Sequence, residues 1–254
     1  ATSSVQPVAT ALPKSEPALL QAAAACNLRS VKQVLQGPEL DVNAVDRRFS
    51  RTALAFAADC GCHDVVEALV AAKAELDRQD RHGMTALELA CWKGHPSIVQ
   101  LLLNNGALEL ADHFGVTPLH KAVAFGHEDV VQVLLRHGTA VETQLGESHS
   151  LKGSHGTALH VASWKNHARI VRLLLTEGHA DVHALDEWAC TPLHSAAKSG
   201  SEAVVRVLLE NGADPEFRNS ERLTPRDVAA NAKVRRLLGD ASEGVLQPKS
   251  LHGH

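Results

Sequence analysis

The chain has 254 residues, of which 44% are hydrophobic, and its 25 basic residues nearly balance 29 acidic ones, for a net charge of −4. This balance argues against nucleic acid as the main partner, because proteins that bind it carry a basic patch or stripe. The apolar runs are only a few residues long, far short of the roughly 20 that a membrane-spanning helix needs.

The two ends of the chain differ in composition from the part between them. Residues 1–15 are rich in Ala, Ser, Thr and Pro without hydrophobic periodicity, and residues 240–254 are similar with Gly, Ser and Pro. We predict a flexible or partner-bound tail at each end. The chain begins without Met, which fits Met removal, a trimmed chain or a cleaved targeting segment, and the sequence leaves these three open.

Between the tails, one six-residue motif recurs along the chain. Its clearest form is Thr117-Pro-Leu-His-Lys-Ala122, and related copies begin with Thr at positions 52, 85, 157, 191 and 224. Successive copies lie 33, 32, 40, 34 and 33 residues apart. A period in this range indicates an array of stacked repeats and not a globular domain.

Each copy predicts a pair of helices. Thr117 is a good N-cap, Pro118 suits the first helical position, and Gly126 ends the helix in the left-handed conformation. A second helix follows, with Val130-Val131 and Leu134-Leu135 forming one apolar stripe at helical spacing. A polar stretch of roughly ten residues then leads to the next Thr, as expected for a turn or hairpin.

Three parts of the array are irregular. The segment from Pro17 to Leu35 has apolar residues in the right slots but lacks the Thr and the Gly. In the last copy Arg226 replaces the core Leu, and residues 234–238 predict a shortened second helix. The 40-residue interval adds about seven residues to one hairpin, within 141–155. Such insertions often carry function, although drift in a tolerant surface loop fits equally well.

These motifs resemble the ankyrin repeat over about residues 16–239. The resemblance implies an all-α repeat solenoid, in which helix–turn–helix units with β-hairpin loops stack into a curved array. The hairpins and first helices would line its concave face. We count seven repeats, five of them regular, beginning near residues 17, 52, 85, 117, 157, 191 and 224. The irregular end repeats fit capping, because a polar outer face keeps an array soluble.

The sequence contains no motif of phosphate binding, serine hydrolases or zinc proteases, so we predict no enzyme and no cofactor. Sixteen histidines are present, and six of them recur at two fixed offsets in the repeats, which predicts a structural role for these six. An active site needs convergent groups instead of a ladder. The histidines follow the Thr-Pro-Leu slots (His120, His160, His194) or the helix-ending slots (His95, His127, His167).

Five scattered cysteines do not predict a disulfide framework, and a reducing compartment is the simpler interpretation. Four of them fall near one end of the first helices of adjacent repeats, where stacking would gather tetrahedral zinc ligands. The opposing interpretation is that Cys is a common small buried residue. The weak metal candidates are Cys26, Cys60, Cys62 and Cys91.

Aromatic residues are scarce, with no Tyr and only eight Phe and Trp residues, so their positions are informative. Five of them occupy slots that, in the family resembled, vary freely and face the concave groove. Lysines accompany them, which predicts an aromatic and locally basic face for an acidic or amphipathic protein segment. Alternatively, some of the rings fold inward against neighbouring helices. The predicted partner-binding residues are Trp92, Lys93, Phe114, Phe125, Trp164, Lys165, Trp188 and Lys198.

We therefore predict a non-catalytic scaffold or adaptor that binds a protein partner through this face, alone or as a subunit of a larger assembly. A regulatory, inhibitory subunit of an enzyme is the alternative, and a metal-dependent role of the cysteines is a third. We expect a monomer in isolation, inside the cell in a reducing compartment, with the cytoplasm as the first expectation. An organelle stays open as the alternative if a targeting segment has been cleaved.

Overall fold

The computed structural model describes residues 17–37, 40–145 and 155–243. The predicted tail 1–15, residues 244–254 of the second predicted tail and residues 146–154 of the predicted insertion lie outside the described residues. Helix α13 continues to Ser242, beyond the predicted end of the array at residue 239.

The described residues form helices and contain no strand, only the isolated β-bridges Val45–Thr52 and Leu145–Gly156. None of these helices is long and apolar enough to cross a bilayer. The helices are α1 (Ala18–Ala24), α2 (Leu28–Leu35), α3 (Ala53–Cys60), α4 (His63–Ala71), α5 (Ala86–Lys93), α6 (Pro96–Asn104), α7 (Pro118–Phe125), α8 (Glu128–Arg136), α9 (Ala158–Trp164), α10 (Ala168–Thr176), α11 (Pro192–Ser199), α12 (Glu202–Glu210) and α13 (Ala232–Ser242).

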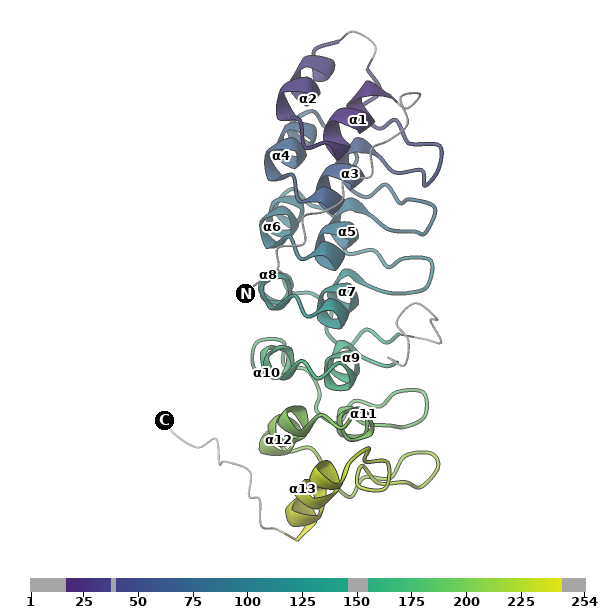
Figure 1. Ribbon diagram of the computed structural model, residues 1–254, viewed down its shortest axis with the longest axis vertical. Helices are drawn as coiled ribbons and strands as arrows, with labels where there is room; N and C mark the ends of the chain where they lie inside the picture. Colours follow the sequence, from purple (N-terminus) through teal and green to yellow (C-terminus); the bar gives the residue numbers. More distant parts are fainter. Residues whose placement is uncertain (1–16, 38–39, 146–154, 244–254) are drawn as a thin grey trace, which may run out of the picture. The chain divides into compact units, whose positions relative to one another are not determined.

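The helices belong to two compact units, one ending at His113 and one beginning at Phe114. In the first unit α1, α3 and α5 pack side by side in one layer, and α2, α4 and α6 form a second layer (Figure 1). In the second unit α7, α9 and α11 form one layer, while α8, α10, α12 and α13 form the other. The predicted helical repeat architecture is confirmed within each unit.

The predicted helix boundaries follow from local capping. The Thr that opens each regular repeat is the N-cap of α3, α5, α7, α9 or α11, and its hydroxyl accepts a backbone N–H of the first turn. Gly61, Gly94, Gly126 and Gly200 end four of these helices with left-handed backbones. The sequence therefore determined these ends through the orphan backbone groups of each helix.

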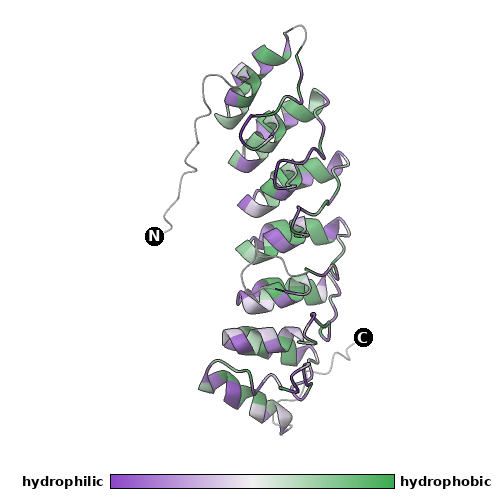
Figure 2. Ribbon diagram, turned by 90° about the vertical axis from the view of Figure 1, so that its right-hand side faces the viewer, coloured by the Kyte–Doolittle hydropathy of each residue, from purple (hydrophilic) through white to green (hydrophobic). Residues whose placement is uncertain are grey.

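The apolar stripes form the core, since every helix carries hydrophobic residues together with hydrophilic ones (Figure 2). The Leu of each regular motif is at most 1% exposed. The second helices contribute two adjacent β-branched residues and the first Leu of each predicted pair, all buried, as in Val130, Val131 and Leu134. Each such side chain stabilises the fold by roughly 1.5–3 kcal/mol, so packing alone accounts for the stripes.

The last repeat departs from the prediction. Its second helix is not shortened, because α13 spans 11 residues, and it is the first helix that is reduced to a turn at residues 225–228. Arg226 lies beside Gly239 of α13. The Asp227 carboxylate accepts hydrogen bonds from both the backbone N–H and the hydroxyl of Thr224. A charged residue in the core slot removes the apolar anchor that a buried first helix needs.

Candidate functional site

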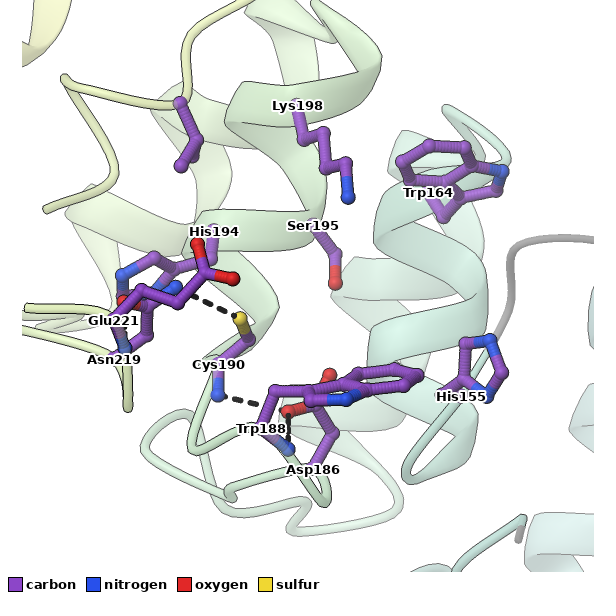
Figure 3. A pocket seen from close by; sticks show the side chains of 11 residues that line it. His155, Trp164, Asp186, Trp188, Cys190, His194, Ser195, Lys198, Asn219 and Glu221 are labelled. Atoms are coloured by element: carbon purple, nitrogen blue, oxygen red, sulfur yellow. Dashed lines mark hydrogen bonds between the residues drawn. The ribbon is translucent and has the colours of Figure 1, made fainter. Parts of the chain in front are cut away.

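A pocket of about 300 Å³ in the second compact unit gathers three of the eight predicted partner-binding residues. Trp164 ends α9, Lys198 lies near the end of α11, and Trp188 lies on the loop before α11; their side chains approach the same space (Figure 3). Equivalent slots of adjacent repeats meet here because α9 and α11 pack against each other.

Hydrogen bonds to the Asp186 carboxylate, which belongs to the same loop, fix the conformation of the Trp188 loop. Asp186 Oδ1 accepts the backbone N–H groups of Trp188 at 3.0 Å and Cys190 at 2.8 Å, and the Asp186 N–H donates to the Cys190 carbonyl. The next loop adds a contact, since the Ser220 N–H donates to the Trp188 carbonyl. Trp188 is 44% exposed, and its backbone is thus held by hydrogen bonds from its own loop and from the next one.

His155 completes one side of the pocket, and sequence reasoning missed it. Its ring meets the Trp188 ring edge-on, with centroids 4.5 Å apart and planes at 83°. Its Nδ1 lies 3.3 Å from Glu187 Oε1, although this approach lacks the geometry of a hydrogen bond. The long 40-residue interval brings His155 there, because the chain rejoins the repeat through the Leu145–Gly156 bridge.

The pocket carries both signs of charge. Lys198 is exposed, and Glu221 and Asp186 also line the cavity. The acidic side chains come from the loops before the Thr motifs and were not predicted. A hint lay in the sequence, because an Asp or Asn stands five residues before Thr85, Thr117, Thr191 and Thr224.

Two polar groups of the pocket, His194 and Cys190, are engaged with their surroundings. His194 uses both ring nitrogens: Nδ1 accepts the Thr191 N–H at 3.2 Å, and Nε2 lies 3.1 Å from the Leu223 carbonyl. Burial raises the pKa of the Cys190 thiol, and a hydrogen bond from Asn219 opposes that shift only in part. Cys190 is therefore a poor nucleophile at neutral pH, because the thiolate is the reactive form.

The remaining predicted binding residues lie elsewhere. Trp92 and Lys93 belong to the first compact unit, where Trp92 is half-buried against Ala55, Met84 and Leu89. Lys93 lies 4.7 Å above the Trp92 ring and 3.7 Å from the Asp59 carboxylate. For Trp92, the alternative that some of the rings fold inward against neighbouring helices therefore holds in part.

Phe114, Phe125 and Lys165 belong to the second compact unit but do not line the pocket. Phe114 is 51% exposed and Phe125 is 50% exposed. Phe125 stacks on His127 with ring centroids 6.5 Å apart, and Lys165 is half-buried at the C-cap of α9.

The structure corrects two expectations about the cysteines: that they form no disulfides, and that four of them gather as metal ligands. Cys26 and Cys62 form a disulfide across the first two repeats, with Cα atoms 5.3 Å apart, which removes both from the metal candidates. The Cys60 thiol donates to the Ala24 carbonyl, and Cys91 is fully buried. No group of three potential metal ligands occurs among the described residues. Stacking did bring cysteines of adjacent repeats together, but as a bonded pair.

The family model for ankyrin repeats (3 copies) matches overlapping segments of the chain: 19–110, 94–145, 107–186, 139–219 and 159–241. The ankyrin repeat domain of Bcl-3, described as a unique member of the IkappaB protein family, is similar with a TM-score of 0.76 and 30% identity. The similarity covers 89% of this chain and 100% of that one. The human ASB11 ankyrin repeat domain has a TM-score of 0.77 and 29% identity, covering 92% and 100%.

Among curated proteins, the B-cell lymphoma 3 protein homolog of Mus musculus is 33% identical over 222 residues, 86% of this chain and 49% of that protein. The nuclear factor NF-kappa-B p105 subunit of Gallus gallus is 32% identical over 191 residues, 67% of this chain. Protein phosphatase 1 regulatory subunit 12A of Mus musculus is 43% identical over 76 residues, 30% of this chain. The chain spans 19% of the p105 protein and 7% of the phosphatase subunit.

Proposed function

The chain belongs to the ankyrin-repeat family, and we propose that it is a non-catalytic interaction module that binds a segment of a protein partner at the Trp164–Trp188–Lys198 pocket. The observation that carries this proposal is the presentation of two indoles at one cavity by neighbouring repeats. Trp is enriched among the few residues that supply most of the binding energy at interfaces.

The fixed loop supports this proposal. Because Asp186 and Ser220 hold the Trp188 backbone, the indole loses little conformational freedom when a partner binds. A pocket of about 300 Å³ suits one or two side chains of a partner better than a whole cofactor. Lys198 at its rim favours a partner segment with an acidic residue beside its apolar anchor.

We extend the proposed surface to the other predicted residues, each within its own compact unit. Phe114, Phe125 and Lys165 would add contacts in the second unit, where the two phenylalanines expose half of their surface. Trp92 and Lys93 would form a smaller contact in the first unit. The Lys93 ammonium above the Trp92 ring keeps that pair at the surface although the indole is half-buried.

The test compares capture of partner proteins by the intact chain and by Trp188→Ala. Loss of a hot-spot Trp costs at least about 2 kcal/mol, or roughly thirtyfold in affinity. The matched control is Leu108→Ala, which removes another half-exposed apolar side chain, in the first compact unit. We expect a partner that Trp188→Ala loses and Leu108→Ala retains, with both variants folded by circular dichroism. If both variants capture the same partners as the intact chain, the proposal that the pocket binds the partner is contradicted.

A second candidate function is regulation of an enzyme by such binding. It is favoured by the 43% identity with a protein named as a phosphatase regulatory subunit, although over only 76 residues. If the captured partner is an enzyme, adding the chain should change its activity and Trp188→Ala should not. If the activity of the enzyme is unchanged at a saturating concentration of this protein, the regulatory function is contradicted and only the adaptor function remains.

A further inference from the structure

Two adjacent loops in the first compact unit form a surface that the pocket does not involve. These loops precede α3 and α5 and lie next to each other (Figure 1). The Arg81 N–H donates to the Phe49 carbonyl at 2.8 Å, and its guanidinium donates to the Arg47 carbonyl at 2.8 Å and to Ser50 Oγ at 3.2 Å. Arg81 alone thus binds the second loop to the first by three hydrogen bonds.

Two acidic side chains of these loops, Asp46 and Asp80, are turned inward. Asp46 is 2% exposed, and its carboxylate accepts the backbone N–H groups of Arg48, Phe49 and Arg51. Asp80 is 5% exposed and accepts an N–H of its own loop while pairing with Arg51 at 2.9 Å. These two carboxylates, which stand next to Arg47 and Arg81 in the sequence, are therefore used for the internal structure of the loops.

Three arginines next to these carboxylates face outward, whereas Arg51 is turned inward to Asp80. Arg47, Arg48 and Arg81 are exposed. The hydrogen bonds of the Arg81 guanidinium go to neutral oxygens, so they leave its charge uncompensated. Arg48 lies with Cζ 4.8 Å above the Phe49 ring and, among the described residues, makes no ion pair. A chain of net charge −4 thus carries a small positive surface at this point.

The guanidinium groups are also positioned in advance. Stacking on Phe49 restricts Arg48, and two hydrogen bonds to the neighbouring loop restrict Arg81. Planar guanidinium forks bind carboxylates through paired hydrogen bonds, and a fork held in place loses less entropy on binding. His82 lies near the same ring, with its centroid 6.3 Å from that of Phe49.

We propose that this surface, defined by Arg47, Arg48, Phe49 and Arg81, binds an acidic peptide segment of a protein partner. Charge complementarity selects carboxylates, and Phe49 offers one aromatic contact beside them. Duplex nucleic acid is disfavoured, because it requires a longer basic stripe than two loops provide. The inference rests on the proposed function as a protein-binding module and adds a second contact in the other compact unit.

The experiment measures binding of a fluorescein-labelled Glu-Asp-Gly repeat peptide to the full chain by anisotropy, with a Gln-Asn-Gly peptide as the uncharged probe. Arg48→Gln/Arg81→Gln removes two charges from the surface. The matched control, Arg29→Gln/Lys32→Gln, removes two exposed charges on α2 of the same unit. We expect the acidic peptide to bind in a salt-dependent way, and the first variant to bind it about tenfold more weakly.

Three results overturn the inference: equal weakening in both double variants, no difference between the two peptides, or tighter binding of duplex DNA or phosphatidylserine vesicles at the same arginines. Circular dichroism and thermal unfolding of each variant separate a lost surface from a lost fold. The peptide experiment does not depend on Trp188, so a negative result does not contradict the proposed pocket. Conversely, loss of partner capture by Trp188→Ala does not depend on these arginines.

Discussion

His160 of one repeat binds the backbone of the next, with Nε2 lying 2.9 Å from the carbonyl oxygen of Cys190. On its other side Nδ1 accepts the Thr157 N–H at 3.2 Å, so Nε2 carries the proton and the ring is neutral. His194 repeats the arrangement with Thr191 and Leu223. The recurring histidine therefore joins the cap of its own helix to the following loop, which confirms its predicted structural role.

Removing this link should destabilise the fold. His160 is 1% exposed, so His160→Ala loses several buried hydrogen bonds and leaves a cavity. We expect about 2–3 kcal/mol less unfolding free energy in urea. His183→Ala, at an exposed histidine, is the control and should stay within about 0.5 kcal/mol of the parent. A similar loss of unfolding free energy in both variants would contradict the structural role of the recurring histidines.

Stability should fall in mild acid. Burial lowers the pKa of His120 to about 4, and burial also lowers the pKa values of His160 and His194. Between the ordinary pKa of 6.5 and about 4, the unfolded chain binds a proton at His120 that the folded chain does not. Unfolding free energy therefore decreases as pH falls through this window and is constant, for this group, below it.

His120 alone contributes up to about 3 kcal/mol to that decrease. Urea titrations at several pH values measure it, and NMR of the His120 ring reports the titration directly. The control is His120→Asn, which should flatten part of the dependence. A His120 ring that titrates near 6.5 in the folded chain would refute the prediction.

The disulfide should stabilise the fold by linking the first repeat to the second. Cys26 and Cys62 are 36 residues apart, and closing a loop of that length stabilises a chain by roughly 2–4 kcal/mol. We expect reduction to lower the melting temperature of the first compact unit. The three free cysteines predict three reactive thiols in the unfolded, unreduced chain. Finding five there would show that the pair is reduced.

Gly61 and Gly106 provide a matched pair of substitutions. Both have left-handed backbones, with φ of 77° and 87°, so Ala is strained at either position. A Cβ at Gly61 would lie 2.6 Å from the His95 ring, whereas a Cβ at Gly106 would meet nothing within 4 Å. We expect Gly61→Ala to cost at least about 1 kcal/mol more than Gly106→Ala in chemical denaturation. Equal costs would mean that His95 moves away freely.

The sequence by itself determined the repeat period, the capped helix boundaries and the buried stripe, because each depends on local capping and on helical spacing within about 33 residues. Thr117 and Gly126, for example, mark the ends of α7 without any knowledge of neighbours. The same reasoning predicted that aromatic side chains would gather on adjacent repeats. It could not predict which ones meet or which polar groups accompany them.

Only the tertiary structure decided those questions. It grouped Trp164 and Trp188 with Lys198, packed Trp92 against Met84, and joined Cys26 to Cys62. It also replaced the first helix of the last repeat by a turn. The physical reason is that side-chain direction and loop conformation depend on contacts between repeats, such as that of Ser220 with Trp188. Residues about one repeat apart make these contacts, and a periodic pattern carries no information about how their individual side chains fit together.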